Sequence, residues 1–72
     1  MRNEKKDFQV ACSEILLKLV DGESEPEQVI AAIQAKEPLI FEETIRGAIW
    51  HLIDFGDIEA TYHGTLKLPQ TS

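Results

Sequence analysis

The stretch from Ile45 to Leu68 constrains the fold of this chain more than any other part of the sequence. Its first half places apolar residues at helical spacing, which predicts a helix over Glu42–Phe55 with one buried side. Gly56 follows, and glycine readily adopts the left-handed conformation that ends a helix. Two short strand-like runs follow within Ile58–Leu68, separated by a turn, and this pattern predicts a β-hairpin. This order predicts a small α+β domain with the hairpin at its C-terminal end.

The register of the hairpin follows from the chemistry of the facing side chains. A two-residue His63-Gly64 loop would set apolar residues opposite polar ones on each face. A three-residue loop, Tyr62-His63-Gly64, gives every residue a matched partner and puts Gly64 where a left-handed residue is needed. We therefore expect Tyr62 and His63 at the exposed tip. The predicted pairs are Ile58 with Leu68, Glu59 with Lys67, Ala60 with Leu66 and Thr61 with Thr65.

Two further helices are predicted upstream. The first covers about Asp7–Val20, with Asp7 as its N-cap and Gly22 just after its end. Its apolar stripe is widened by Leu17 and Val20, which indicates contact with more than one element. The domain is thus expected over residues 7–69, with a flexible N-terminus at 1–6 and a tail at 70–72.

The second helix is predicted to begin at Ser24. Ser24 and Glu27 have the spacing of a capping box, and Pro26 suits the first helical turn because its missing N–H costs nothing there. Pro38 ends the segment. The apolar run Leu39-Ile40-Phe41 then either pairs briefly as a strand or fills the core.

Composition limits the functions that the chain can serve. Its 72 residues allow one small domain, and its formal charge is −6. A single cysteine, Cys12, excludes an internal disulfide and a Cys-rich zinc site. The sequence has no apolar run that would span a membrane and no signal-peptide pattern, so a reduced, cytoplasmic location is expected. Neither a phosphate loop nor a nucleophile–base pair is visible, so we expect no enzyme, cofactor, metal or small-molecule substrate.

The segment ETIRGAIWHLIDFGDIEATYHGTLKL resembles the third helix and wing of winged helix-turn-helix domains. The matching core positions of the helix, its stop and the strand are Ile45, Ala48, Ile49, Leu52, Gly56 and Ile58. The resemblance covers about residues 7–68 and implies three helices with a two-stranded wing. It implies a binding role rather than one function, because this fold serves DNA binding, protein interaction and dimerisation alike.

The outer face of the third helix differs from that of family members that read DNA. Such members carry several Arg, Lys, Ser, Asn or Gln side chains there. From Glu42 to Leu68 the chain has two bases and five acids, so the net charge is 2 − 5 = −3. The residues that helical projection places on the outer face are Glu43, Arg46, Gly47, Trp50 and Asp54, and only one of them is cationic.

Trp50 is open to two interpretations. It could fold down onto the hairpin or the N-terminal segment as peripheral core, since large apolar residues are mostly buried. It could instead be an exposed anchor for a partner, with Gly47 allowing another backbone to approach. Tyr62 and His63 could likewise contact a partner or form an ordinary turn. His51 is expected to be solvated, and Cys12 to be an inert core thiol.

Three functions therefore remain open for this chain. The leading hypothesis is a non-catalytic module that binds a protein, or a second copy of itself, through the third helix and the wing. It predicts a contiguous apolar patch that includes Trp50. An acidic cluster is either a solvated loop and helix start, a docking surface for a basic protein, or a mimic of a phosphate backbone; its members are Asp21, Glu23, Glu25 and Glu27.

The rival hypothesis is a transcriptional regulator that places the third helix in the major groove of DNA. The third is a structural accessory domain without a ligand of its own. The cations available to the DNA-binding hypothesis are Arg2, Lys5, Lys6, Arg46 and Lys67, the first three as an N-terminal arm.

Overall fold

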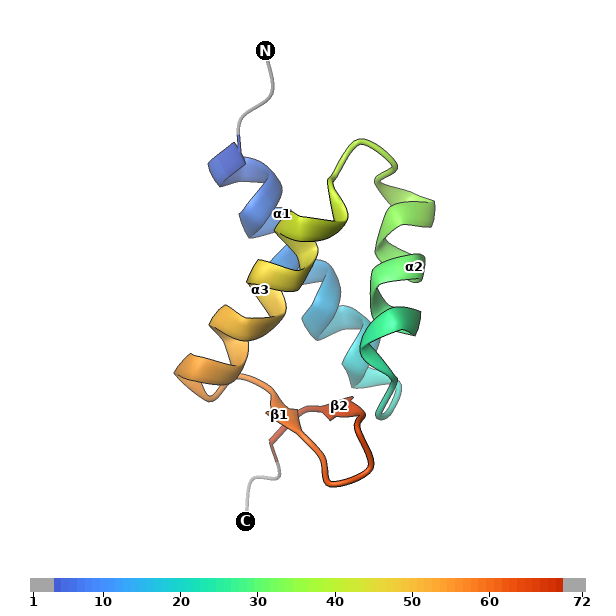
Figure 1. Ribbon diagram of the computed structural model, residues 1–72, viewed down its shortest axis with the longest axis vertical. Coiled ribbons are helices and arrows are strands. Elements are labelled where there is room, and N and C mark those ends of the chain that lie inside the picture. Colours follow the sequence, from blue (N-terminus) through green and yellow to red (C-terminus); the bar gives the residue numbers. More distant parts are fainter. Residues whose placement is uncertain (1–3, 70–72) are drawn as a thin grey trace.

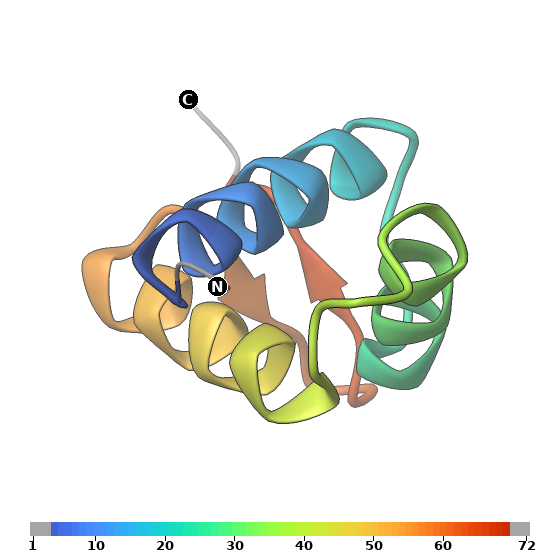
Figure 2. The same cartoon turned by 90° about the horizontal axis from the view of Figure 1, so that it is seen from above.

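The computed structural model describes residues 4–69 and has three helices followed by a two-stranded antiparallel sheet (Figure 1). The three helices stand around a shared interior, and the hairpin lies across one end of them (Figure 2). This arrangement confirms the predicted α+β class and is compatible with a winged-helix layout. The elements are α1 (Glu4–Val20), α2 (Pro26–Lys36), α3 (Glu42–Phe55), β1 (Glu59–Ala60) and β2 (Leu66–Lys67).

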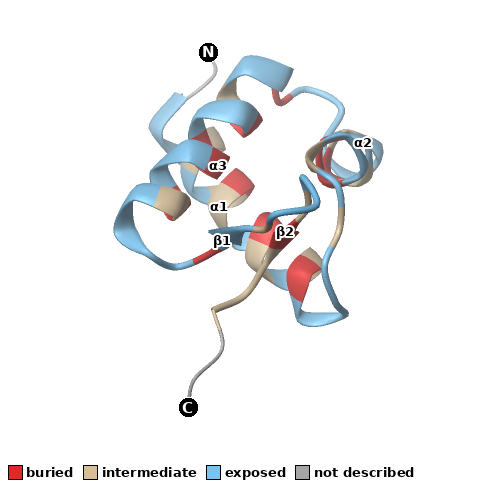
Figure 3. Ribbon diagram, turned by 60° about the horizontal axis from the view of Figure 1, so that its bottom comes forward, coloured by how far each residue is buried: buried red, intermediate tan, exposed pale blue. Residues whose placement is uncertain are grey.

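The core draws on every helix and on the hairpin. Its buried residues face the interior that the helices and the hairpin share (Figure 3). None of the buried residues in the described part of the chain is polar or charged, so the core gains its stability from apolar burial. The buried residues are Ala11, Ile15, Leu19, Val29, Ile30, Ile33, Ile40, Ile45, Ala48, Ile49, Leu52, Ile58 and Leu66.

Helix α3 has the bounds that the sequence predicts and ends in a left-handed turn. Gly56 has φ +80°, and its N–H donates to the carbonyl of Ile53 at 3.0 Å. The N–H of Asp57 donates to the carbonyl of Leu52 at 2.9 Å, which completes a Schellman motif. This turn reverses the chain and delivers Ile58, only 1% exposed, to the end of the core.

The hairpin has the predicted register. Glu59 pairs with Lys67 and Ala60 with Leu66. Beyond them the N–H of Thr61 donates to the carbonyl of Thr65 at 2.7 Å, which closes the three-residue loop.

The hairpin is joined to the start of α2 by a backbone bridge that the sequence did not reveal. The N–H of Ser24 donates to the carbonyl of Leu66 at 3.0 Å, and the N–H of Leu66 donates to the carbonyl of Ser24 at 2.7 Å. Strand β2 therefore has a partner on both edges. Because Ser24 serves this bridge, the predicted Ser24–Glu27 capping box is wrong, and Glu25 and Gln28 form the capping box of α2 one residue later.

Helix α1 is longer than predicted. It already includes Glu4, so Asp7 lies within the helix and the prediction of Asp7 as N-cap is wrong. Residues 4–6, expected to belong to a flexible start, are helical, whereas residues 1–3 and 70–72 lie outside the described part of the chain.

Several apolar side chains near the helix ends are more exposed than predicted. Leu17 and Val20 are exposed, but the prediction that this helix contacts more than one element is confirmed, because α1 packs against both α2 and α3. In the connection between α2 and α3, only Ile40 is buried, while Leu39 and Phe41 are exposed. This connection forms no strand and contributes a single side chain to the core.

Two glycines of the α3 region should respond oppositely to alanine. Gly47→Ala should raise the free energy of unfolding by roughly 0.5–1 kcal/mol, because glycine weakens a helix interior and the new Cβ would meet only Phe8 Cε2, at 4.0 Å. Gly56→Ala should lower it by roughly 1–2 kcal/mol, because alanine is strained at positive φ. Urea denaturation of both variants measures the two effects, and equal signs would contradict the described end of α3.

Candidate functional site

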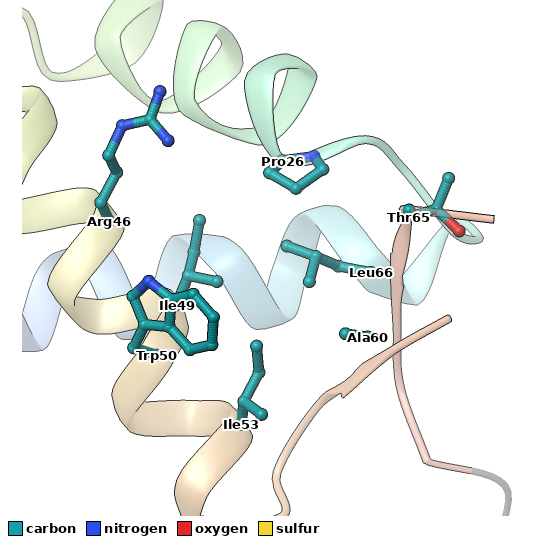
Figure 4. Close-up of a pocket in the computed structure, with 9 residues that line it drawn as sticks. Pro26, Arg46, Ile49, Trp50, Ile53, Ala60, Thr65 and Leu66 are labelled. Carbon is teal, nitrogen blue, oxygen red and sulfur yellow. The ribbon is translucent and has the colours of Figure 1, made fainter. Parts of the chain in front are cut away.

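An apolar groove of about 270 Å³ lies between α3 and the hairpin (Figure 4). Helix α3 forms one side and the hairpin the other, and the first residue of α2 closes the space between them. Its volume lies just below the roughly 300–1,000 Å³ typical of small-molecule sites, which suits one or two side chains better than a cofactor. The lining residues are Pro26, Arg46, Ile49, Trp50, Ile53, Ala60, Gly64, Thr65 and Leu66.

A small residue of β1, Ala60, leaves the groove open on the side of the hairpin. Ala60 pairs with Leu66, and directly paired residues of an antiparallel sheet project from the same face. Leu66 is only 2% exposed, whereas the shorter side chain of Ala60 stays exposed and lines the groove. A larger side chain at this position would fill the space between the hairpin and α3.

Trp50 forms the outer wall of the groove. Its side chain projects from α3 beside Ile49 and Ile53, on the side facing the hairpin and Pro26 (Figure 4). It is 66% exposed, so its interpretation as peripheral core is wrong. The apolar patch that the protein-binding hypothesis predicted around Trp50 is present in the structure.

The two described cations of α3 and the hairpin are each held by a carboxylate. Arg46 Nε donates to Glu42 Oε2 at 2.8 Å, one turn earlier on α3. Lys67 Nζ lies 3.9 Å from Glu59 Oε2 across the hairpin. Both pairs are substantially exposed, so they add little to stability but offset the positive charge that DNA would require.

The other cations proposed for DNA binding do not join this face. Lys5 and Lys6 belong to the first turn of α1, at the opposite end of the helices from the hairpin (Figure 1). Arg2 lies outside the described residues. The described cations proposed for DNA binding, Lys5, Lys6, Arg46 and Lys67, therefore do not form one cationic patch.

The residues proposed for partner binding fall into separate places. Arg46 and Trp50 line the groove. Glu43 and Gly47 instead lie beside the start of α1, in a shallow hollow that includes Phe8. Asp54 is exposed in the last turn of α3 and is absent from the groove lining.

Tyr62 and His63 at the hairpin tip are absent from the groove lining. Tyr62 is 102% exposed, and its ring meets that of His63 edge-on at 6.4 Å. Gly64 of the same three-residue loop does line the groove, so the tip adjoins it.

Sequence reasoning missed seven of the nine residues that line the groove: Pro26, Ile49, Ile53, Ala60, Gly64, Thr65 and Leu66. One feature of the sequence could have revealed the groove. In the correct register, Ala60 is a small residue on the apolar face of the hairpin, next to Ile58 and opposite Leu66. A small residue among large ones on a buried face leaves a hollow.

His51 and Cys12, the other side chains that could carry chemistry, are surrounded by packing contacts. The ring of His51 contacts those of Phe8 and Phe55 edge-on, with centroids 5.1 and 4.5 Å apart. Cys12 is half-buried; burial raises the pKa of its thiol, and the carboxylate of Asp57 raises it further.

Residues 4–69 contain neither a metal-binding cluster nor a membrane-spanning helix. No group of three or more His, Cys, Asp or Glu side chains is placed to hold a metal ion. No helix in this range combines the length and apolar character needed to cross a membrane.

Comparison with known proteins assigns the chain to no family: no family model, curated protein or solved structure matches it.

The raised pKa of Cys12 predicts that its thiol reacts slowly with alkylating reagents. At a pH below the pKa, Cys12 holds a smaller thiolate fraction than an unperturbed cysteine, and the thiolate is the reacting form. We expect alkylation by iodoacetamide at pH 8 to be slower in the folded domain than in the same chain unfolded in urea. Equal rates would contradict both the burial and the raised pKa.

Proposed function

We propose that this chain is a non-catalytic interaction domain of winged-helix type that binds a protein segment in the groove between α3 and the hairpin. The helix order, the glycine stop and the hairpin register support the winged-helix assignment. The observation that carries the binding role is Trp50, which stands exposed beside an apolar hollow that is already open.

The chemistry of Trp50 favours a protein as the ligand. Tryptophan is enriched among the few residues that supply most of the binding energy of an interface, usually next to a pocket that excludes water. Its exposure in a chain this small leaves apolar area in water, which a partner would cover.

DNA fits this face less well. The described stretch from Glu42 to Leu68 has a net charge of −3, and its two cations, Arg46 and Lys67, already face carboxylates. Nucleic-acid affinity depends largely on cations that replace the counterions of phosphate. A second copy of the chain is also less suitable, because each copy brings a charge of −6.

The groove is tested by filling it. Random 12-residue peptides displayed on phage are selected on the native domain, and selected peptides are labelled and titrated by fluorescence anisotropy. Ala60→Leu should weaken their binding at least about tenfold because leucine occupies the hollow, and Trp50→Ala should do the same by removing its wall.

Two controls accompany this test. Glu43→Gln, on the far side of α3, should bind the peptides as the native domain does. Because positions 50 and 60 are exposed, all three variants should keep an unfolding free energy within about 1 kcal/mol of the native value. Selected peptides that bind Ala60→Leu as tightly as the native domain would refute the groove as the binding site.

A salt titration separates this proposal from the DNA-binding alternative. We expect negligible binding of duplex DNA even at 20 mM salt, because the α3–hairpin face lacks unpaired cations among its described residues. Tight binding at low salt that falls steeply as salt rises, and that Arg46→Ala abolishes, would favour the DNA-binding regulator instead.

A further inference from the structure

We propose that the segment received by the groove combines one bulky apolar side chain with a lysine or arginine three or four residues away. This inference rests on the proposed function and names the chemistry of the partner at the same groove. It follows from the apolar lining of the groove and from the carboxylates of a neighbouring hollow that shares Arg46 with it.

The apolar end lies between Trp50 and the hairpin. Trp50, Ile53 and Ala60 surround the open space there, and the volume of about 270 Å³ accepts a large side chain. Because Ala60 leaves the hollow open in the unbound domain, a ligand side chain can enter without first displacing a core residue.

Beyond Arg46, a charged residue of the groove lining, lies a neighbouring hollow between α2 and α3, which we call the acidic end. That hollow carries Glu27 and Glu42. The carboxylate of Glu25, which caps the N-terminus of α2 directly before the groove residue Pro26, adds a further negative charge. These four ionisable groups give 1 − 3 = −2, so this end attracts a cation.

The distance between the two ends sets the spacing in the ligand. Trp50 and Glu42 are eight residues apart on α3, which corresponds to about 12 Å along the helix axis. An extended chain advances about 3.3 Å per residue, so about three or four residues span that distance. An apolar residue in the hollow thereby places a lysine or arginine three or four positions away beside Glu27 and Glu42.

The net charge of the domain also favours a basic segment over the other candidate ligands of the groove. The domain carries −6 overall, so a basic segment is attracted at long range, whereas an acidic segment or a phosphate backbone is repelled. A second copy of this chain would meet the acidic end with its own excess of carboxylates.

The composition of the selected peptides tests the inference. Peptides enriched on the native domain should share a bulky apolar residue with a lysine or arginine three or four positions away. Peptides that share the apolar residue and depend on an open groove, but show no preference for a cation at that spacing, would overturn this inference and leave the proposed function standing. Peptides insensitive to Ala60→Leu would overturn the proposed function itself.

Neutralising the two carboxylates tests the position of the cation. The probe is a labelled synthetic peptide with one leucine and one lysine four residues later in a Gly/Ser background, or a selected peptide of that pattern. The variant Glu27→Gln/Glu42→Gln should bind it roughly threefold to tenfold more weakly than the native domain, as expected for two solvent-exposed ion pairs. Glu27→Gln alone, which keeps the Arg46–Glu42 pair, should lose part of that affinity.

The matched control is Glu37→Gln/Glu43→Gln, which changes the net charge equally at two carboxylates beside α1. It should bind the peptide within about twofold of the native domain at 150 mM salt, where distant charges are screened. Equal losses in the two double variants would overturn the inference, because they would show a general effect of net charge and no cation site between α2 and α3.

Discussion

The two-sided backbone pairing of Leu66 holds the parts of this small domain in register. On one edge Leu66 exchanges hydrogen bonds with Ser24, just before α2, and on the other it lies opposite Ala60 of the hairpin. Its side chain is buried in the core at the same point. The hairpin is thereby fixed to both the second helix and the interior. The side of the hairpin that faces α3 therefore has a defined position.

Much of the fold could be predicted from local chemistry, because the hairpin pairs and the end of α3 depend on residues close in sequence. The matching of Glu59 with Lys67 and the glycine at position 56 were sufficient for both. The start of α2 could not be predicted in the same way, since the backbone of Ser24 bonds to Leu66, far along the chain. No local pattern reports that use of Ser24.

The candidate site was predicted only in part, for a related reason. Helical projection correctly placed Arg46 and Trp50 outside the main core stripe, and both line the groove. Projection along one helix cannot show which neighbouring element each residue faces, so it grouped them with Glu43 and Gly47, which lie beside α1. The groove itself arises from the difference in size between Ala60 and its neighbours, which matters only once three elements are packed together.

The brevity of β1 has a consequence for how this molecule meets other chains. One edge of β1 pairs with β2, and the strand is only two residues long and begins with the charged Glu59. Short, charged sheet edges are poor templates for the addition of a further strand. The sheet therefore offers a second copy of the domain little backbone with which to pair edge to edge. In the proposed binding role, selectivity would then rest on the shape and charge of side chains, not on backbone pairing that any extended sequence could imitate.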